Sequence, residues 1–153
     1  MGENVEYAPR LIGKPALVDA CGRLVKSMRI SVTDRCNLRC TYCLPRTVRF
    51  GRTDELLAFD DIVCVVRAAC RLGIDHVRLT GGEPLVRPGV PELVARLKRE
   101  THVREVALTT NGVLLERHVD ALARAGLDRL TVSVDSLRPE RFRAITCLGE
   151  IGG

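Results

Sequence analysis

The amino-acid sequence predicts an α/β fold in which a parallel sheet of about four strands is flanked by helices. Short runs rich in β-branched residues alternate with amphipathic segments of helical period, and the repeat takes about 25 residues. Of the 153 residues, 46% are hydrophobic, which excludes a disordered chain. The length allows one domain with a core, but it is too short for a complete eight-stranded barrel of about 250 residues.

The N-terminal part begins with a stretch that has no sustained periodicity. Residues 1–27 are expected to be irregular, apart from a short hairpin over residues 16–25 that turns at 21–22. The β-branched residues of 28–32 predict the first strand, and a loop that carries cysteines follows it.

The first helix is predicted from an apolar stripe that ends at Leu72. Asp60 or Asp61 is expected to cap its N-terminus, and Gly73 is expected to end it. Residues 76–79 then predict the second strand.

The rest of the chain repeats this alternation. Strands are predicted over 104–108 and 130–134, and helices over 90–99, 114–125 and 139–145. Strand, helix, strand at this spacing indicates βαβ units and therefore parallel pairing.

The loops that leave the four predicted strands carry most of the unusual chemistry. They contain the cysteines of 36–43, then Thr-Gly-Gly-Glu-Pro at 80–84, Thr-Thr-Asn-Gly at 109–112 and Ser-Val-Asp-Ser at 133–136. Ligands of parallel α/β sheets bind beyond the carboxyl ends of the strands. We therefore expect one shared site at this edge.

Three cysteines have the spacing C-x3-C-x2-C, at Cys36, Cys40 and Cys43. Three thiolates so close together favour a 4Fe–4S cluster with one open iron. A structural zinc site is an alternative, although no fourth ligand lies at zinc-finger spacing. A thiol redox pair is another, although it would leave Cys36 unexplained. The other four cysteines are dispersed and fit small buried hydrophobic positions.

The flanking residues narrow this choice. Residues 29–45, Arg-Ile-Ser-Val-Thr-Asp-Arg-Cys-Asn-Leu-Arg-Cys-Thr-Tyr-Cys-Leu-Pro, are similar to the radical S-adenosylmethionine (SAM) motif. With Arg-Leu-Thr-Gly-Gly-Glu-Pro-Leu at 78–85, Leu-Thr-Thr-Asn-Gly at 108–112 and Val-Ser-Val-Asp-Ser at 132–136, the chain resembles the GTP 3′,8-cyclase (MoaA) family of molybdenum cofactor biosynthesis. The resemblance covers residues 17–146 and implies a partial (β/α) barrel of the radical SAM type.

The resemblance implies a cofactor pair. Cys36, Cys40 and Cys43 would ligate three irons of a 4Fe–4S cluster, and SAM would chelate the fourth. Reductive cleavage of SAM would give a deoxyadenosyl radical that takes hydrogen from ribose C3′ of GTP, after which this carbon would attack guanine C8. The cofactor performs this chemistry, and the protein contributes positioning and the exclusion of water.

The resemblance also implies which residues bind the small molecules. The backbone around Tyr42 would meet adenine, Gly82 would let the main chain approach the methionyl group, and Ser133 would supply a hydroxyl to SAM. The positions that hold GTP are Arg29, Arg78 and Thr109. A reducing partner of flavodoxin or ferredoxin type and a homodimer are further expectations.

Simpler roles stay open for several of these residues. Glu83 could only organise its own loop by accepting backbone N–H bonds, and Asn111-Gly112 is a turn signal. Asp135 could cap the last helix, and Arg29 and Arg78 could be surface arginines.

The family chain is about twice as long and has a C-terminal region with a second cysteine triad, which is not present here. We divide the sequence into an N-terminal extension (1–27), a radical SAM core (28–146) and a divergent tail (147–153), and expect a truncated chain that does not complete the GTP reaction alone. Another radical SAM enzyme, acting on a peptide or small molecule, and a non-catalytic remnant are the alternatives.

Composition sets the remaining limits. The net charge is +5, and nearly all cations are arginines, which suits an anionic ligand or reflects a GC-rich gene. The cations are scattered and aromatics are few, so nucleic acid is not an expected partner. No apolar run reaches the roughly 20 residues of a membrane span, and the N-terminus lacks a signal-peptide pattern. With an odd number of cysteines, this favours a reducing cytoplasm.

Overall fold

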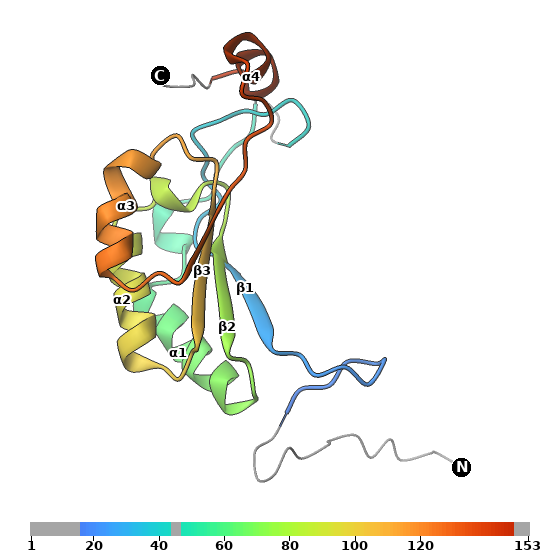
Figure 1. Cartoon of the computed structure of the whole chain (residues 1–153), viewed down its shortest axis with the longest axis vertical. Helices are drawn as coiled ribbons and strands as arrows, with labels where there is room; N and C mark the ends of the chain where they lie inside the picture. The colour runs from blue at the N-terminus through green and yellow to red at the C-terminus, as the bar shows by residue number, and fades with distance from the viewer. Residues whose placement is uncertain (1–15, 44–46, 149–153) are drawn as a thin grey trace.

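The computed structural model describes residues 16–43 and 47–148, and it confirms the predicted α/β class. Its four strands pair in parallel in the order β1-β2-β3-β4 (Figure 1). The strands are β1 (Ser27–Ser31), β2 (His76–Thr80), β3 (Glu105–Thr110) and β4 (Arg129–Val132). Consecutive strands of the chain are therefore neighbours in the sheet, as in the first half of a barrel.

Helices cover one face of this sheet. The segments α1, α2 and α3 lie side by side along the face, whereas α4 lies beyond the carboxyl ends of the strands (Figure 1). The helices are α1 (Phe59–Arg71), α2 (Val90–Glu100), α3 (Leu115–Arg124) and α4 (Pro139–Thr146), and two short 3-10 helices are η1 (Thr53–Glu55) and η2 (Pro84–Val86).

The core lies between the sheet and these three helices. Val77 and Leu79 of β2 and Leu108 of β3 point to the helical side and are at most 1% exposed. They pack with Leu93 and Leu97 of α2, which are fully buried. Burial of each such side chain contributes roughly 1.5–3 kcal/mol, so the apolar stripe of α2 decides which face of the sheet is covered.

The opposite face of the sheet is open and polar. Side chains alternate along a strand, so the register places Arg29, Arg78, Ala107 and Arg129 in one row across the four strands. Arg29 and Arg129 are exposed, and Arg78 is half-buried. In a closed barrel this face would be the interior, which makes it the natural place for a ligand.

The first helix begins earlier than predicted. Ala58 is the N-cap residue, and the carboxylate of Asp61 accepts a hydrogen bond from the Ala58 N–H at 3.2 Å. The expectation that Asp60 or Asp61 is the cap is therefore wrong, because Asp61 acts from the third helical position. Gly73 follows the helix with a φ of 92°, which confirms it as the stop.

Two smaller predictions have different outcomes. The hairpin is present as a single antiparallel bridge between Val18 and Leu24. Arg138, and not Asp135, is the N-cap residue of α4, so the capping role suggested for Asp135 is wrong. Residues 1–15 of the predicted extension and 149–153 of the predicted tail lie outside the described residues. Within the described part, no helix is long and apolar enough to cross a membrane.

Candidate functional site

A pocket at the carboxyl edge of the sheet gathers the loops that follow all four strands. Seven of the nine residues predicted for the site line it: Cys36, Tyr42, Cys40, Cys43, Gly82, Thr109 and Ser133. Arg29 and Arg78 do not line it, because they lie lower on the open face of the sheet. The shared edge predicted from the sequence is therefore confirmed for the pocket, and the two arginines are placed apart from it.

The cysteine loop is held against the last helix. The backbone N–H of Arg39 donates to the carbonyl of Thr146 at 3.0 Å, and that of Thr41 donates to Ile145 at 2.9 Å. Leu38 and Phe142, both 4% exposed, line the same pocket. The last helix thus positions the cysteine loop, although the two segments lie about a hundred residues apart in the sequence.

The thiols differ in their surroundings. Burial raises the pKa of Cys40, and negative charge on Asp135, Cys36 and Cys43 raises it further, while a hydrogen bond with Tyr42 opposes the change. Cys43 is exposed. Because a metal ligand must be the thiolate, a bound cation would have to supply the charge that favours deprotonation of Cys40.

Tyr42 joins the cysteine loop to the end of β4. Its hydroxyl donates to the carboxylate of Asp135, with oxygen distances of 2.9 and 3.1 Å. This hydrogen bond, with smaller contributions from burial and from Cys40, raises the pKa of Tyr42 to about 12. Asp135 thus has a role in the pocket that the sequence did not reveal, because its partner lies 93 residues away.

Glu83 organises the centre of the edge. It is 1% exposed, and its carboxylate accepts hydrogen bonds from the Leu85 N–H at 3.0 Å, the Thr110 hydroxyl at 2.7 Å and the Asn111 N–H at 2.7 Å. Glu83 therefore does organise its own loop, as the sequence suggested, and it also holds the loop after β3. These contacts leave the loops after β2 and β3 fixed to each other.

Gly81 and Gly82 let the β2 loop lie directly on the chain that leads to the cysteines. A Cβ on Gly81 would lie 2.4 Å from the Thr33 carbonyl oxygen, and a Cβ on Gly82 would lie 2.3 Å from that of Arg35. The N–H of Gly82 donates to Thr33, and that of Glu83 donates to Arg35, both at 2.8 Å. The first reason for these glycines is therefore backbone packing, and Gly82 still borders the pocket.

Asn111 is a site residue that sequence reasoning missed. Its side-chain amide donates to Asn37 at 2.8 Å and lies 3.9 Å from the Cys36 sulfur. The sequence presented it only as part of an Asn-Gly turn, and Gly112 does adopt a φ of 86°. The turn and the amide contact are compatible, because the turn orients the Asn111 side chain toward the cysteine loop.

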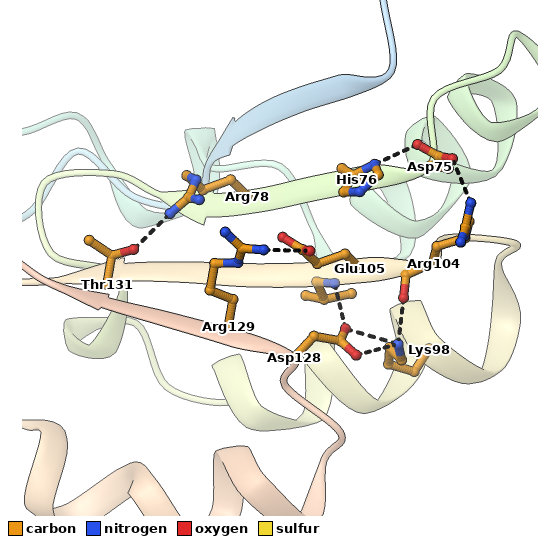
Figure 2. A network of polar contacts seen from close by, with 10 residues as sticks. Asp75, His76, Arg78, Lys98, Arg104, Glu105, Asp128, Arg129 and Thr131 are labelled. Carbon is orange, nitrogen blue, oxygen red and sulfur yellow. Dashed lines mark hydrogen bonds and ion pairs between the residues drawn. The ribbon is translucent and has the colours of Figure 1, made fainter.

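Arg78 links the open face to the pocket. Its guanidinium donates to the hydroxyls of Thr109 at 3.2 Å and Thr131 at 3.0 Å, and Figure 2 shows it directed across the sheet toward Thr131. Both partners are neutral, so its charge is available to an anion. Arg29 is its cross-strand neighbour in the register. A surface role alone does not explain the position of Arg78.

The donor set of the pocket fits an iron–sulfur cluster with three protein ligands. The three thiols and the glycine loop border one pocket, and thiolates are the ligands that such clusters take. Across residues 16–43 and 47–148, no group of three or more His, Cys, Asp or Glu side chains, the three pocket thiols included, is already arranged around a metal position.

A comparison with protein families places the sequence in one superfamily. The model of the radical SAM superfamily matches residues 30–151, which is most of the chain. The chain therefore belongs to the radical SAM superfamily.

The individual proteins that are similar to this chain include enzymes named GTP 3′,8-cyclase. The chain is 50% identical over 136 residues to a GTP 3′,8-cyclase of Heliobacterium modesticaldum, and 46% identical over 152 residues to one of Caulobacter vibrioides. These alignments cover 88% and 97% of this chain but only 42% and 43% of the relatives. The chain thus spans less than half the length of the curated relatives that it matches.

A solved structure supports the fold independently. The crystal structure of BtrN in complex with AdoMet and 2-DOIA superposes with a TM-score of 0.58 at 20% sequence identity. The match covers 80% of this chain and 51% of that chain. At this identity the similarity establishes the shared α/β architecture.

Proposed function

We propose that the chain is the radical SAM part of a GTP 3′,8-cyclase, the lyase that converts GTP to (8S)-3′,8-cyclo-7,8-dihydroguanosine 5′-triphosphate in molybdenum cofactor biosynthesis. The observation that carries the proposal is the pocket that joins three thiols to Gly82, Thr109 and Ser133. The relatives named GTP 3′,8-cyclase support the choice of reaction. The proposed core is residues 28–146, with an N-terminal extension and a C-terminal tail.

In this proposal Cys36, Cys40 and Cys43 hold a 4Fe–4S cluster. When bound and reduced, such a cluster supplies the electron that cleaves SAM into methionine and a deoxyadenosyl radical. The amide of Asn111, close to Cys36, would restrain this part of the loop. Leu38 and Phe142 would exclude water from the apolar side of the pocket.

SAM would lie against the loops that the four strands present. The backbone near Tyr42 would contact adenine, and the tie between Tyr42 and Asp135 would hold that backbone in place. Gly82 would face the methionyl group, and the Ser133 hydroxyl would donate to SAM. The Glu83 contacts would keep the β2 and β3 loops from spreading when SAM binds.

GTP would bind on the open face beside this pocket. Arg78 and Arg29 would meet the triphosphate, since guanidinium groups match phosphate oxygens in a bidentate manner. Thr109 both lines the pocket and accepts a hydrogen bond from Arg78. It would therefore hold GTP next to SAM, where the hydrogen transfer takes place.

The proposed reaction needs one electron from outside the chain. We assign this role to a reducing partner of flavodoxin or ferredoxin type. None of the seven cysteines, all of which lie within the described residues, forms a disulfide bond, which suits a reducing cytoplasm.

The decisive test is low-temperature EPR of the anaerobically reconstituted, dithionite-reduced chain, with and without SAM. We expect a 4Fe–4S signal whose g-values move when SAM is added. Cys40→Ser should lose iron and signal, whereas Cys64→Ser, a change at an exposed position of α1, should retain both. Equal iron retention by the two variants would refute the ligand assignment.

The substrate is tested by the yield of 5′-deoxyadenosine from reduced chain and SAM. GTP should stimulate this yield, and ATP should not. Formation of deoxyadenosine that GTP leaves unchanged would keep the radical SAM assignment and reject GTP as the substrate.

A further inference from the structure

The side-chain amide of Asn111 is directed at the sulfur of Cys36, one of the three proposed cluster ligands. The amide nitrogen donates to this sulfur across 3.9 Å, and the backbone N–H of Leu38 donates to it across 3.4 Å. We propose that Asn111 is a positioning residue whose N–H raises the reduction potential of the cluster through Cys36. The inference rests on the proposed function, because it requires that these cysteines hold a cluster.

The surrounding contacts determine which end of the amide faces the sulfur. The Oδ1 atom of Asn111 accepts a hydrogen bond from the backbone N–H of Val113 at 3.0 Å, so the nitrogen points the other way. One hydrogen of this nitrogen goes to Oδ1 of Asn37, at 2.8 Å. An amide nitrogen carries two hydrogens, so the second is available to Cys36. Turning the amide over would lose the Val113 contact and would bring an oxygen to the sulfur.

The backbone of Asn111 is anchored as well. Its N–H donates to the carboxylate of Glu83 at 2.7 Å, and Glu83 is 1% exposed. The contacts that orient the amide therefore come from the protein alone and are in place before a cluster binds. Partners of this kind, which lie behind the ligands of a metal centre, tune its affinity and its potential.

The chemistry of the contact gives the direction of the effect. Reduction adds one negative charge to an iron–sulfur cluster, and a hydrogen bond to a ligand sulfur stabilises the more negative form. The Asn111 amide therefore favours the reduced form. Cys36 is partly buried, and its neighbour Leu38 is 4% exposed, so water screens the contact only in part. The electron that the proposed reaction needs would be easier to accept with this amide present.

Two substitutions separate this role from a purely structural one. Asn111→Asp keeps an oxygen that can accept from the Val113 N–H, but it replaces the two N–H donors with negative charge. Asn111→Ala removes the donors and the Val113 contact together. A structural role predicts that the aspartate variant resembles the wild type more closely than the alanine variant does. The proposed role predicts the reverse order for the potential.

An EPR-monitored redox titration of the anaerobically reconstituted chain, without SAM, measures the midpoint potential. We expect it to fall in the order wild type, Asn111→Ala, Asn111→Asp. The equilibrium constant for reduction should drop about threefold or more with alanine and about tenfold or more with aspartate, and tenfold corresponds to about 59 mV for one electron.

The control is a structural change at the adjacent position. Thr110→Val breaks the buried hydrogen bond of 2.7 Å to Glu83 but removes no donor from the sulfur. It should lower stability toward urea and leave the potential unchanged. If it shifts the potential as far as Asn111→Ala does, the shift reports a disturbed loop, and the inference is wrong.

The failure of this inference can be told from the failure of the proposed function. Equal potentials in the wild type and Asn111→Ala, or an aspartate variant that lies between them, would overturn the inference while the cluster assignment stands. If the alanine variant binds too little iron to titrate, the aspartate variant decides, and a potential at or above the wild-type value overturns the inference. A wild-type chain that binds no iron refutes the proposed function and this inference with it.

Discussion

The buried carboxylate of Glu83 accepts a hydrogen bond of 2.7 Å from the hydroxyl of Thr110, 27 residues further along the chain. The contact joins the β2 loop to the end of β3 at the centre of the pocket edge. With two backbone N–H donors on the same carboxylate, it makes Glu83 the main link between neighbouring loops.

Replacing Glu83 should therefore cost stability before it affects any ligand. Glu83→Ala leaves three donors without their acceptor, and we expect a loss of about 2–4 kcal/mol in the free energy of unfolding. Glu92→Ala, on the exposed side of α2, should cost less than about 1 kcal/mol. Urea unfolding under anaerobic, reducing conditions measures both, and equal losses would contradict the organising role.

Gly82 offers a test of backbone packing. The methyl group in Gly82→Ala would meet the Arg35 carbonyl at 2.3 Å, so one of the two loops must move. We expect a loss of about 3 kcal/mol or more, together with weaker SAM binding.

The matched control is Gly22→Ala. Gly22 has a φ of 78° and no atom within 4 Å of its added Cβ, so this change carries only the conformational cost of about 1 kcal/mol. If both alanine variants unfold at the same urea concentration, the close approach at Gly82 is not what requires a glycine.

The acid stability of the fold should depend on Asp128. Burial pushes the pKa of Asp128 upward, but the N–H of Val106 and the Lys98 ammonium prevail and hold it below its ordinary value of 3.8 (Figure 2). A carboxyl whose pKa is lower in the folded chain stabilises it above pH 3.8, and this contribution disappears as the pH falls through the folded-state pKa.

The measurement compares the chain with Asp128→Asn in urea at pH 7 and pH 3. The variant should be less stable at pH 7, and the difference should shrink at pH 3. Adding Lys98→Gln to Asp128→Asn should cost only the exposed hydrogen bond from Lys98 Nζ to the Arg104 carbonyl, since the carboxylate partner of Lys98 is already neutral. A difference that is constant with pH would refute this account.

Arg78 should contribute to the affinity for GTP and not to the affinity for SAM. Arg78→Ala removes a guanidinium held by two neutral hydroxyls, and we expect GTP binding to weaken by about tenfold or more. Arg104→Ala, at the amino end of the sheet with a side chain 79% exposed, should leave GTP affinity unchanged. Calorimetric titration with GTP and with SAM separates these effects, and equal GTP affinities in the two variants would exclude Arg78 from the site.

The sequence by itself determined the order and type of the elements. Apolar residues at a period of two in β2 and β3, and at helical spacing in α2, have only one face to bury, so the parallel sheet and its covered side follow from local pattern. The spacing of Cys36, Cys40 and Cys43 and the glycines after β2 are equally local. These motifs predicted the correct edge of the sheet for the site, because the carboxyl ends of parallel strands lie at the same edge.

Only the tertiary structure decided how these parts are joined. Helix capping was one role left open for Asp135, but Asp135 accepts a hydrogen bond from Tyr42 instead. The Asn111 amide, in the loop after β3, lies close to Cys36 in the loop after β1. Arg78 and Thr109 come from different strands, and only their register places them in contact. Such partners are many residues apart in sequence, and their contacts depend on loop geometry and strand register, which hydrophobic periodicity does not encode.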